Sequence, residues 1–207
     1  MIGQSWKTFA LAAAVIGAGT LAAGLATRAQ TPGPAAYTAD GKLLFPKDYR
    51  SWVYLSSGMD MAYVEGPGMA NMSMFDNVFV NRESYDAFQK TGTWPDKTVM
   101  VLEVRRGEQN GSINKRGRFQ TGRLAAEVHV KDVDRFKGGW AFFAFNGESP
   151  GQLIPQDRDC YSCHAEHAAV DTTFVQFYPT LLPIAKDKKT LSAAYLAEEA
   201  AKAKPPG

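Results

Sequence analysis

The residues best suited to chemistry in this 207-residue chain lie together, since both cysteines and one of three histidines fall within residues 160–164, CYSCH. C-x-x-C-H is the attachment pattern of c-type haem, in which two thiols form thioethers with the porphyrin vinyl groups and the histidine ligates the iron. Two intervening residues bring both sulfurs to one edge of the ring, and the next residue then lies under the iron. The motif predicts one covalent haem c, anchored by Cys160 and Cys163 and ligated by His164.

Three other uses of two nearby thiols compete with haem attachment. A zinc site takes about four protein ligands, and the sequence supplies no second cysteine or histidine pair at a suitable spacing. A thioredoxin-type redox pair belongs at a strand-to-helix turn of a parallel βαβ unit, whereas this motif follows a series of strand-like segments. A disulfide across two residues stays open in an oxidising compartment. Haem is favoured because His164 directly follows the second thiol.

The composition is that of an ordinary globular domain, with 45% hydrophobic and 21% charged residues. At this length we expect one domain with one sizeable core. The net charge is only +2, and the basic residues are scattered among acidic ones, so the sequence shows no patch suited to nucleic-acid phosphates. We therefore expect no nucleic-acid partner.

The N-terminal segment differs from the rest of the chain, because no charge interrupts it between Lys7 and Arg28. We expect residues 1–29 to be a signal peptide that directs the protein to the periplasm. An uncleaved anchor, which would leave the protein tethered to the membrane, is the alternative, because the apolar run is just long enough to span a bilayer. Composition then predicts a Pro- and Gly-rich tether over residues 30–44 and a folded haem domain over residues 45–200. Residues 201–207 are predicted to be a frayed tail.

Short β-branched and aromatic clusters, separated by turn residues, predict a sheet in the middle of the chain. Helices are predicted at residues 82–92, closed by Gly92, and at the Ala-rich residues 192–203. The sequence thus predicts an α+β fold, mainly an antiparallel β-sheet with flanking helices and a c-type haem attached near the C-terminal end. The expected strands are residues 74–81, 98–106, 123–132 and 140–145.

From Tyr49 onward, over about three quarters of its length, the chain resembles the cytochrome P-460 family, which includes the cytochromes c′-β. The resemblance implies an antiparallel sheet with helices around one haem c, His164 below the iron and an open or weakly occupied distal side. Family members often pair as homodimers. The matching pieces are YRSW (49–52), VFVN (78–81), TGTWPD (91–96), VMVLEVRR (99–106), EVHVKD (127–132), GGWAFFAF (138–145) and CYSCHAEHAAVDTTFVQFYPTLLP (160–183).

Two chemistries share this scaffold within the family that the chain resembles. Cytochromes P-460 carry a lysine cross-linked to the porphyrin and oxidise hydroxylamine, whereas cytochromes c′-β bind nitric oxide or carbon monoxide in an apolar pocket capped by phenylalanine. The cross-linking lysine is expected just before Glu103, where residues 100–102 read MVL; Lys97 and Lys131 lie to either side. We therefore expect an exported cytochrome that binds a small gaseous or nitrogen-oxide ligand. A hydroxylamine-oxidising enzyme and an electron carrier that serves a periplasmic redox partner are the alternatives.

Several further residues are candidates for the site. Phe75 and Phe79 share a strand face and could cap the iron, although such a pair is also typical of a core. Glu127 could relay protons as a catalytic carboxylate, or it could be a solvated strand residue. Asp171 could accept the free N–H of the ligating imidazole.

The remaining histidines and the methionines have simpler readings. His129 is predicted on an exposed strand position, and His167 at the surface or near the haem edge. A second axial ligand from methionine would suit an electron carrier, but packing in an irregular segment is the favoured interpretation of these residues. The methionines concerned are Met59, Met61, Met69, Met72 and Met74.

Overall fold

The structure, a computed structural model, describes residues 34–63 and 72–203. The expected signal peptide lies outside the described residues, as do the start of the expected tether and the end of the expected tail. Within the described ranges, no helix has both the length and the apolar character needed to cross a membrane.

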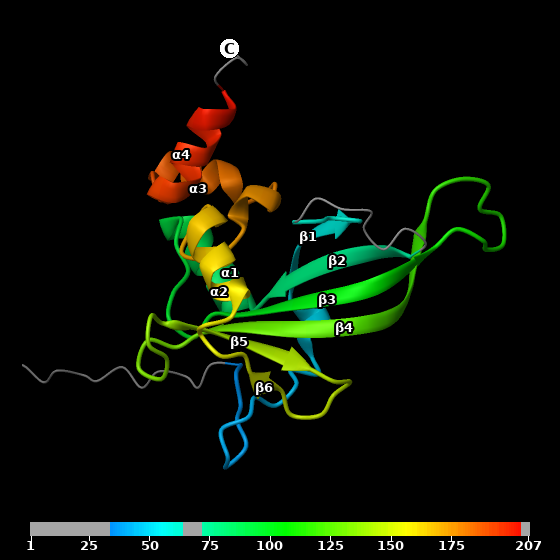
Figure 1. The fold of residues 1–207 in the computed structure, drawn as a ribbon, viewed down its shortest axis with the longest axis horizontal. Helices are drawn as coiled ribbons and strands as arrows, with labels where there is room; N and C mark the ends of the chain where they lie inside the picture. Colours follow the sequence, from blue (N-terminus) through cyan, green and yellow to red (C-terminus); the bar gives the residue numbers. More distant parts are fainter. Residues whose placement is uncertain (1–33, 64–71, 204–207) are drawn as a thin grey trace, which may run out of the picture. The chain divides into compact units, whose positions relative to one another are not determined.

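One antiparallel sheet forms the centre of the described structure, and its strands lie side by side in chain order (Figure 1). A short connection can join neighbouring antiparallel strands, and β2 is joined to β3 through α1 (Arg82–Thr91). The four predicted strands are confirmed as β2 to β5, and the structure adds one strand at each edge that the sequence reading missed. The strands are β1 (Val53–Met59), β2 (Ser73–Val80), β3 (Val99–Glu108), β4 (Phe119–Lys131), β5 (Trp140–Phe145) and β6 (Gln152–Leu153).

The described helices include both predicted ones. The first predicted helix ends at Gly92, whose left-handed backbone (φ 74°) lets its N–H bond the Phe88 carbonyl. The last begins after Ser192, whose side chain accepts a hydrogen bond from the backbone N–H of Tyr195. The helices are α1 (Arg82–Thr91), α2 (Asp159–His167), α3 (Leu182–Lys188) and α4 (Ala193–Lys202), with 3₁₀ turns η1 (Tyr49–Ser51) and η2 (Val175–Phe177).

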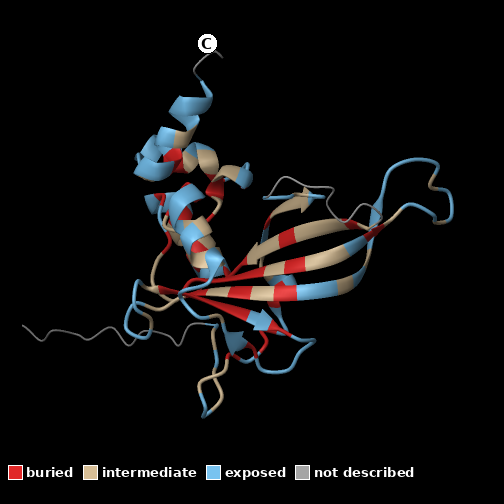
Figure 2. Ribbon diagram, viewed as in Figure 1, coloured by how far each residue is buried: buried red, intermediate tan, exposed pale blue. Residues whose placement is uncertain are grey.

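Both faces of the sheet are covered near its centre, because alternate residues of β3 and of β5 enter different cores. The buried residues of β4 enter one of the two cores, and Figure 2 shows buried positions along these strands. One core packs the helices against Met100 and Phe142 of the sheet. The other packs the chain segment before β1 against Val101 and Phe143. The predicted burial of β3 on both faces is confirmed in its first half, where residues 99–101 are all buried.

Strand register sets two rows of side chains across the helix-covered face. In each row, successive strands contribute residues that are directly opposite one another, so their side chains are neighbours. The members of these rows on β2 to β4 line the site described below. The first row is Val78, Leu102, Glu127 and Ala144, and the second is Met100, His129 and Phe142.

Candidate haem site

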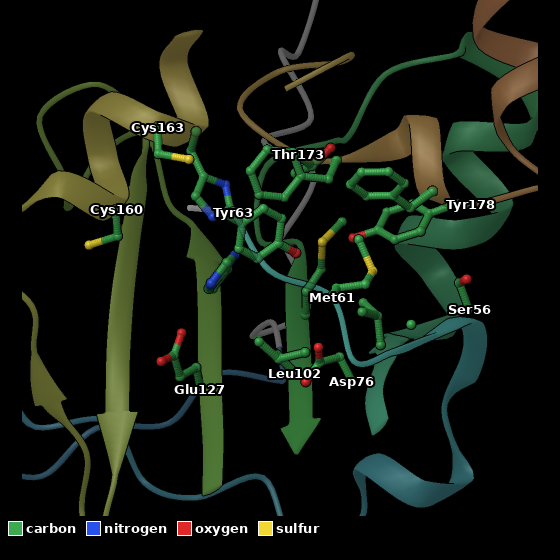
Figure 3. Close-up of a pocket in the computed structure, with 17 residues that line it drawn as sticks. Ser56, Met61, Tyr63, Asp76, Leu102, Glu127, Cys160, Cys163, Thr173 and Tyr178 are labelled. Atoms are coloured by element: carbon green, nitrogen blue, oxygen red, sulfur yellow. The ribbon is translucent and has the colours of Figure 1, made fainter. Parts of the chain in front are cut away.

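Helix α2 carries the whole C-x-x-C-H motif. Residues three and four apart share one helix face, so Cys160, Cys163 and His164 all line the same cavity (Figure 3). Both cysteines are free thiols. The structure therefore brings together the two thiols and the imidazole that the spacing predicted to act as a unit.

The cavity has a volume of about 360 Å³, within the range usual for small-molecule and cofactor sites. Strands β1 to β4 form its floor, α2 forms one wall, and the segment around η2 forms another. Apolar and aromatic groups dominate the lining. The lining residues are Ser56, Gly58, Met61, Tyr63, Asp76, Val78, Met100, Leu102, Glu127, His129, Cys160, Cys163, His164, Thr173, Phe174, Phe177 and Tyr178.

The imidazole of His164 is oriented by a backbone group. Its Nδ1 lies 2.7 Å from the carbonyl oxygen of Thr172, and because a carbonyl only accepts, Nδ1–H is the donor. Asp171 and Thr172 both have left-handed backbones, which present this carbonyl to the ring. Nε2 is left as the nitrogen available for a metal. Burial lowers the pKa of His164, against the effect of this hydrogen bond, and so favours the neutral ring.

Asp171, which the sequence reading considered for this role, points elsewhere. Its carboxylate forms an ion pair with Lys131. The ammonium of Lys131 also donates to the carbonyl oxygen of Trp94 at 2.8 Å. The backbone of the same turn, and not its acidic side chain, therefore supports His164.

His129 lies in the cavity wall, so its predicted exposed position is wrong. Its ring centroid lies 5.0 Å from that of His164 and 4.2 Å from that of Phe142. Burial, and secondarily the proximity of His164, lower the pKa of His129 well below its ordinary value. The strand alternation placed His129 on the correct face, but that face is covered by α2 and does not face solvent.

Two carboxyl groups, those of Asp76 and Glu127, line the largely apolar cavity (Figure 3). Burial and then the charge of Asp76 raise the pKa of Glu127, while burial and then Asp60 raise the pKa of Asp76. The prediction had named Glu127 but not Asp76. The alternation of β2, in which Asp76 and Val78 share a face, was the available signal for the second carboxyl group.

Phe75 and Phe79, the expected distal cap, are not among the residues that line the cavity. Phe79 packs on the opposite face of the sheet, with its ring 5.4 Å from Tyr49 and 5.7 Å from Tyr54. This expectation was wrong because both residues alternate with Asp76 and Val78, which take the cavity side. Aromatic character alone did not identify the face.

Most of the aromatic residues that do line the cavity come from residues 173–178, and Tyr63 is the other. The ring of Phe174 lies 4.3 Å from that of His164, and Phe174 also stacks against Tyr63. Tyr178 is buried, and burial raises the pKa of its phenol. In the sequence this segment is part of the matching piece over residues 160–183, and no role is predicted there for its residues.

Lys97 and Lys131, the two lysines on either side of the expected cross-link position, form ion pairs outside the cavity. Lys97 forms ion pairs with Asp96 and Asp132, and Lys131 is held as described above. No lysine is found among the described residues that line the cavity. This placement agrees with the absence of lysine from residues 100–102.

Of the methionines in the irregular segment, Met61 lines the cavity, as does Met100 of β3. Met59 is exposed, Met72 and Met74 are not part of the described lining, and Met69 lies outside the described residues. His167 is at the surface, as expected, with Nδ1 3.3 Å from a carboxylate oxygen of Glu198.

Comparison with known proteins accounts for this combination of sheet, cavity and motif. The family model described as Cytochrome P460 matches residues 46–175, which include α2 and all six strands. No curated protein matches the chain. The family implies a haem cofactor, and the matched region carries both thiols and the imidazole at one cavity wall. The chain therefore belongs to the cytochrome P460 family.

Proposed function

We propose that the protein is a mono-haem c-type cytochrome that binds a small gaseous or nitrogen-oxide ligand at an open iron position. The observation that carries the proposal is that Cys160, Cys163 and His164 line one largely apolar cavity, while no described lining residue is a lysine. The candidate ligands are nitric oxide, another nitrogen oxide and carbon monoxide.

The donor set fits a covalently attached haem. Cys160 and Cys163 are free and available for thioether bonds, and His164 keeps Nε2 for the metal while Thr172 fixes Nδ1. When bound, the haem would supply an iron centre that takes a ligand or changes its oxidation state. The Thr172 carbonyl would make His164 a stronger donor by holding its N–H.

His129 is unsuited to serve as a second ligand opposite His164. The two rings meet edge to face, with centroids 5.0 Å apart and planes at 74°. This contact leaves no room for an iron atom bonded in line to both rings. The argument supports an iron with one histidine ligand, which reacts with added ligands more readily than an iron with two strong protein ligands.

The rest of the cavity would control which molecules are held. Val78 and Leu102 exclude water from the floor, which favours small apolar gases. Glu127, whose pKa is raised by burial and by Asp76, is a cavity carboxyl group that could exchange a proton with a polar nitrogen ligand. Hydroxylamine oxidation by a lysine-linked haem, the enzymatic alternative, is disfavoured because both nearby lysines are held by carboxylates elsewhere.

One observation favours the electron-carrier alternative, since the thioethers of Met61 and Met100 line the cavity. A methionine opposite His164 would give a low-spin iron with a raised reduction potential. The replacement Met61→Leu keeps the side-chain volume and removes the sulfur, and Met59→Leu is a matched change at an exposed position.

The test is to purify the holoprotein, measure its intact mass, and record spectra of the dithionite-reduced protein before and after addition of carbon monoxide. We expect a mass gain of one haem, a high-spin spectrum and a clear carbon monoxide shift, all unchanged in Met61→Leu and Met59→Leu. A low-spin spectrum that ignores carbon monoxide until Met61 is replaced would establish the electron carrier. A red-shifted reduced band with lysine-linked haem fragments would establish the enzyme.

The export and assembly of the protein belong to the same proposal. We infer that residues 1–29 direct export to the periplasm. The protein has a redox partner in that compartment and pairs into homodimers. N-terminal sequencing of the fractionated protein should begin near Gln30; an intact N-terminus in the membrane fraction would show an anchor instead. Light scattering on the same sample measures the oligomeric state.

A further inference from the structure

Positive charge is concentrated in the β3–β4 hairpin. Residues 105–123 contain six lysine or arginine residues and one acidic residue, Glu108, whereas the rest of the chain contains 17 basic and 20 acidic residues. The net charge of +2 therefore combines a strongly basic hairpin with a slightly acidic remainder. The even scatter of basic residues expected from the sequence is not what the fold presents.

The loop of this hairpin, residues 109–118, extends from the end of the sheet away from α1 and α2 (Figure 1). Its three basic residues, Lys115, Arg116 and Arg118, are all exposed (Figure 2). Ile113 lies beside them with 89% of its surface exposed, the largest value among the exposed large hydrophobic residues. Such an apolar side chain at a projecting tip has no neighbour to cover it within the hairpin.

The loop is ordered by its own hydrogen bonds, so the exposure of Ile113 is built into its fold. The Asn114 side chain donates to the carbonyl oxygens of Gln109 at 2.6 Å and Gly117 at 3.2 Å. The ring of Phe119 packs so closely over Gly111 that a Cβ there would lie 2.5 Å from it. Ser112 adopts a left-handed backbone (φ 44°), a strained state that directly precedes Ile113.

We propose that this hairpin docks the protein on an anionic phospholipid surface, with Ile113 among the acyl chains next to the headgroups and the three loop basic residues on lipid phosphates. A basic loop with an apolar tip suits the membrane interface, because it combines buried apolar area with attraction to anionic lipids. A stable protein partner requires a broad complementary patch of about 800 Å² on each side. A narrow projecting loop offers an insertable tip and not such a patch.

The test compares binding of purified holoprotein to vesicles of phosphatidylcholine alone and of equal parts phosphatidylcholine and phosphatidylglycerol, by co-sedimentation. The first variant replaces Lys115, Arg116 and Arg118 by glutamine. Its control replaces three exposed lysines at the end of α3, Lys186, Lys188 and Lys189, by glutamine, which changes the net charge equally. All chains share one N-terminus, so any contribution of that segment is the same throughout.

A second pair of variants tests the apolar tip. Ile113→Ser removes the exposed apolar group, and Val133→Ser makes the same kind of change at an exposed position in another loop. Both positions are exposed, so neither change should disturb the fold, and circular dichroism with the haem spectrum checks this.

We expect the wild-type protein to prefer the anionic vesicles and to lose binding at high salt. Each basic residue near an anionic surface contributes about fivefold to affinity, so the triple loop variant should bind about a hundredfold more weakly. Ile113→Ser should bind about tenfold more weakly, and both controls should bind as the wild type does. Equal binding by the two triple variants would overturn the proposal. If the loop variants instead lose self-association but keep vesicle binding, the proposal is also overturned. The loop would then contact a second copy of the chain and not a membrane.

Discussion

At the scale of single residues, the cavity carboxyl groups make the stability of the protein depend on pH. The folded state holds the pKa of Glu127 above its ordinary value of 4.5, because burial and Asp76 disfavour the charged form. Between the ordinary pKa and the raised pKa, the folded protein therefore binds more protons than the unfolded chain does. The free energy of unfolding falls as the pH rises through this range. At lower pH, where both states are protonated, this cost is absent.

Glu127→Gln should remove this cost. We expect the melting temperature of the variant to exceed that of the wild type at neutral pH and to approach it in acid, where the wild-type carboxyl group is protonated. Thermal melts of the holoprotein across the pH range measure the difference, with Glu108→Gln on a partly exposed strand position as the control. A variant that is less stable at neutral pH would show instead that the ionised carboxylate has a stabilising partner.

Glu103, on the opposite face of the sheet, behaves in the opposite sense. Burial alone would raise its pKa, but hydrogen bonds from Arg105 and Tyr49, with the charges of Arg105 and Arg50, hold the pKa below its ordinary value. Its stabilising contribution is present above the ordinary pKa and is lost as the pH falls through the lowered one. The ion pairs and the Tyr49 hydrogen bond connect η1 to β3.

Glu103→Gln should destabilise the fold by about 2 kcal/mol at neutral pH, because the arginines lose the charged partner of a buried pair. Urea unfolding at neutral pH measures this loss, and the difference from the wild type should shrink in acid. A change within about 0.5 kcal/mol would mean that the glutamine amide satisfies the network as well as the carboxylate does.

The sequence identified single residues best where covalent spacing defines the chemistry. Cys160, Cys163 and His164 could be found because the motif places all three on one helix face. The carbonyl of Thr172 could not, since every residue has one and only the left-handed turn at residues 171–172 directs this one to His164. Residues that act through the backbone leave no side-chain signal.

At the scale of elements, the junction of α1 and α3 depends on a glycine. Gly92 has a left-handed backbone, and a Cβ there would lie 2.7 Å from Cβ of Lys188 and 2.9 Å from Oγ1 of Thr190. The Thr190 hydroxyl donates to the Gly92 carbonyl oxygen at 2.7 Å. Backbone conformation and close approach therefore both require glycine at this position.

Gly92→Ala should destabilise the protein by about 2 kcal/mol, roughly half from the left-handed conformation and the rest from displacement of the α3 end. Gly122→Ala is the control, because a Cβ at Gly122 meets nothing within 4 Å. Urea unfolding of both variants gives the comparison; equal midpoints would show that the helix junction relaxes without loss.

Local patterns predicted the elements of this protein more reliably than the faces that they bury. The alternation of side chains in β2 and β4 correctly divided their residues between the two faces of the sheet. Alternation alone does not show which of the two faces a distant helix covers. Phe75 and Phe79 were assigned to the cavity for their aromatic character, and His129 to solvent for its polarity. Both assignments failed because α2, which follows β4 by about thirty residues, covers the face that carries His129.

At the scale of the whole molecule, the two cores differ in what completes them. The core behind the sheet is formed by the chain alone, from residues such as Val101, Val128 and Phe143. The core under the helices surrounds the cavity of about 360 Å³, so part of its packing depends on a bound group. Since lining atoms lose contacts where a cavity is unfilled, the helix side should be the less stable side without haem.

A variant with both Cys160→Ala and Cys163→Ala should therefore lose protection locally and not throughout the fold. We expect faster amide hydrogen exchange in α2 and residues 173–178, while β3 to β5 stay protected by the second core. Glu166→Gln, an exposed change on α2 that keeps both thiols, is the matched control and should exchange as the wild type does. Equal loss of protection in the helices and in β3 to β5 would contradict this division into two cores. It would mean that the sheet and its covering helices unfold as one unit that depends on covalent haem.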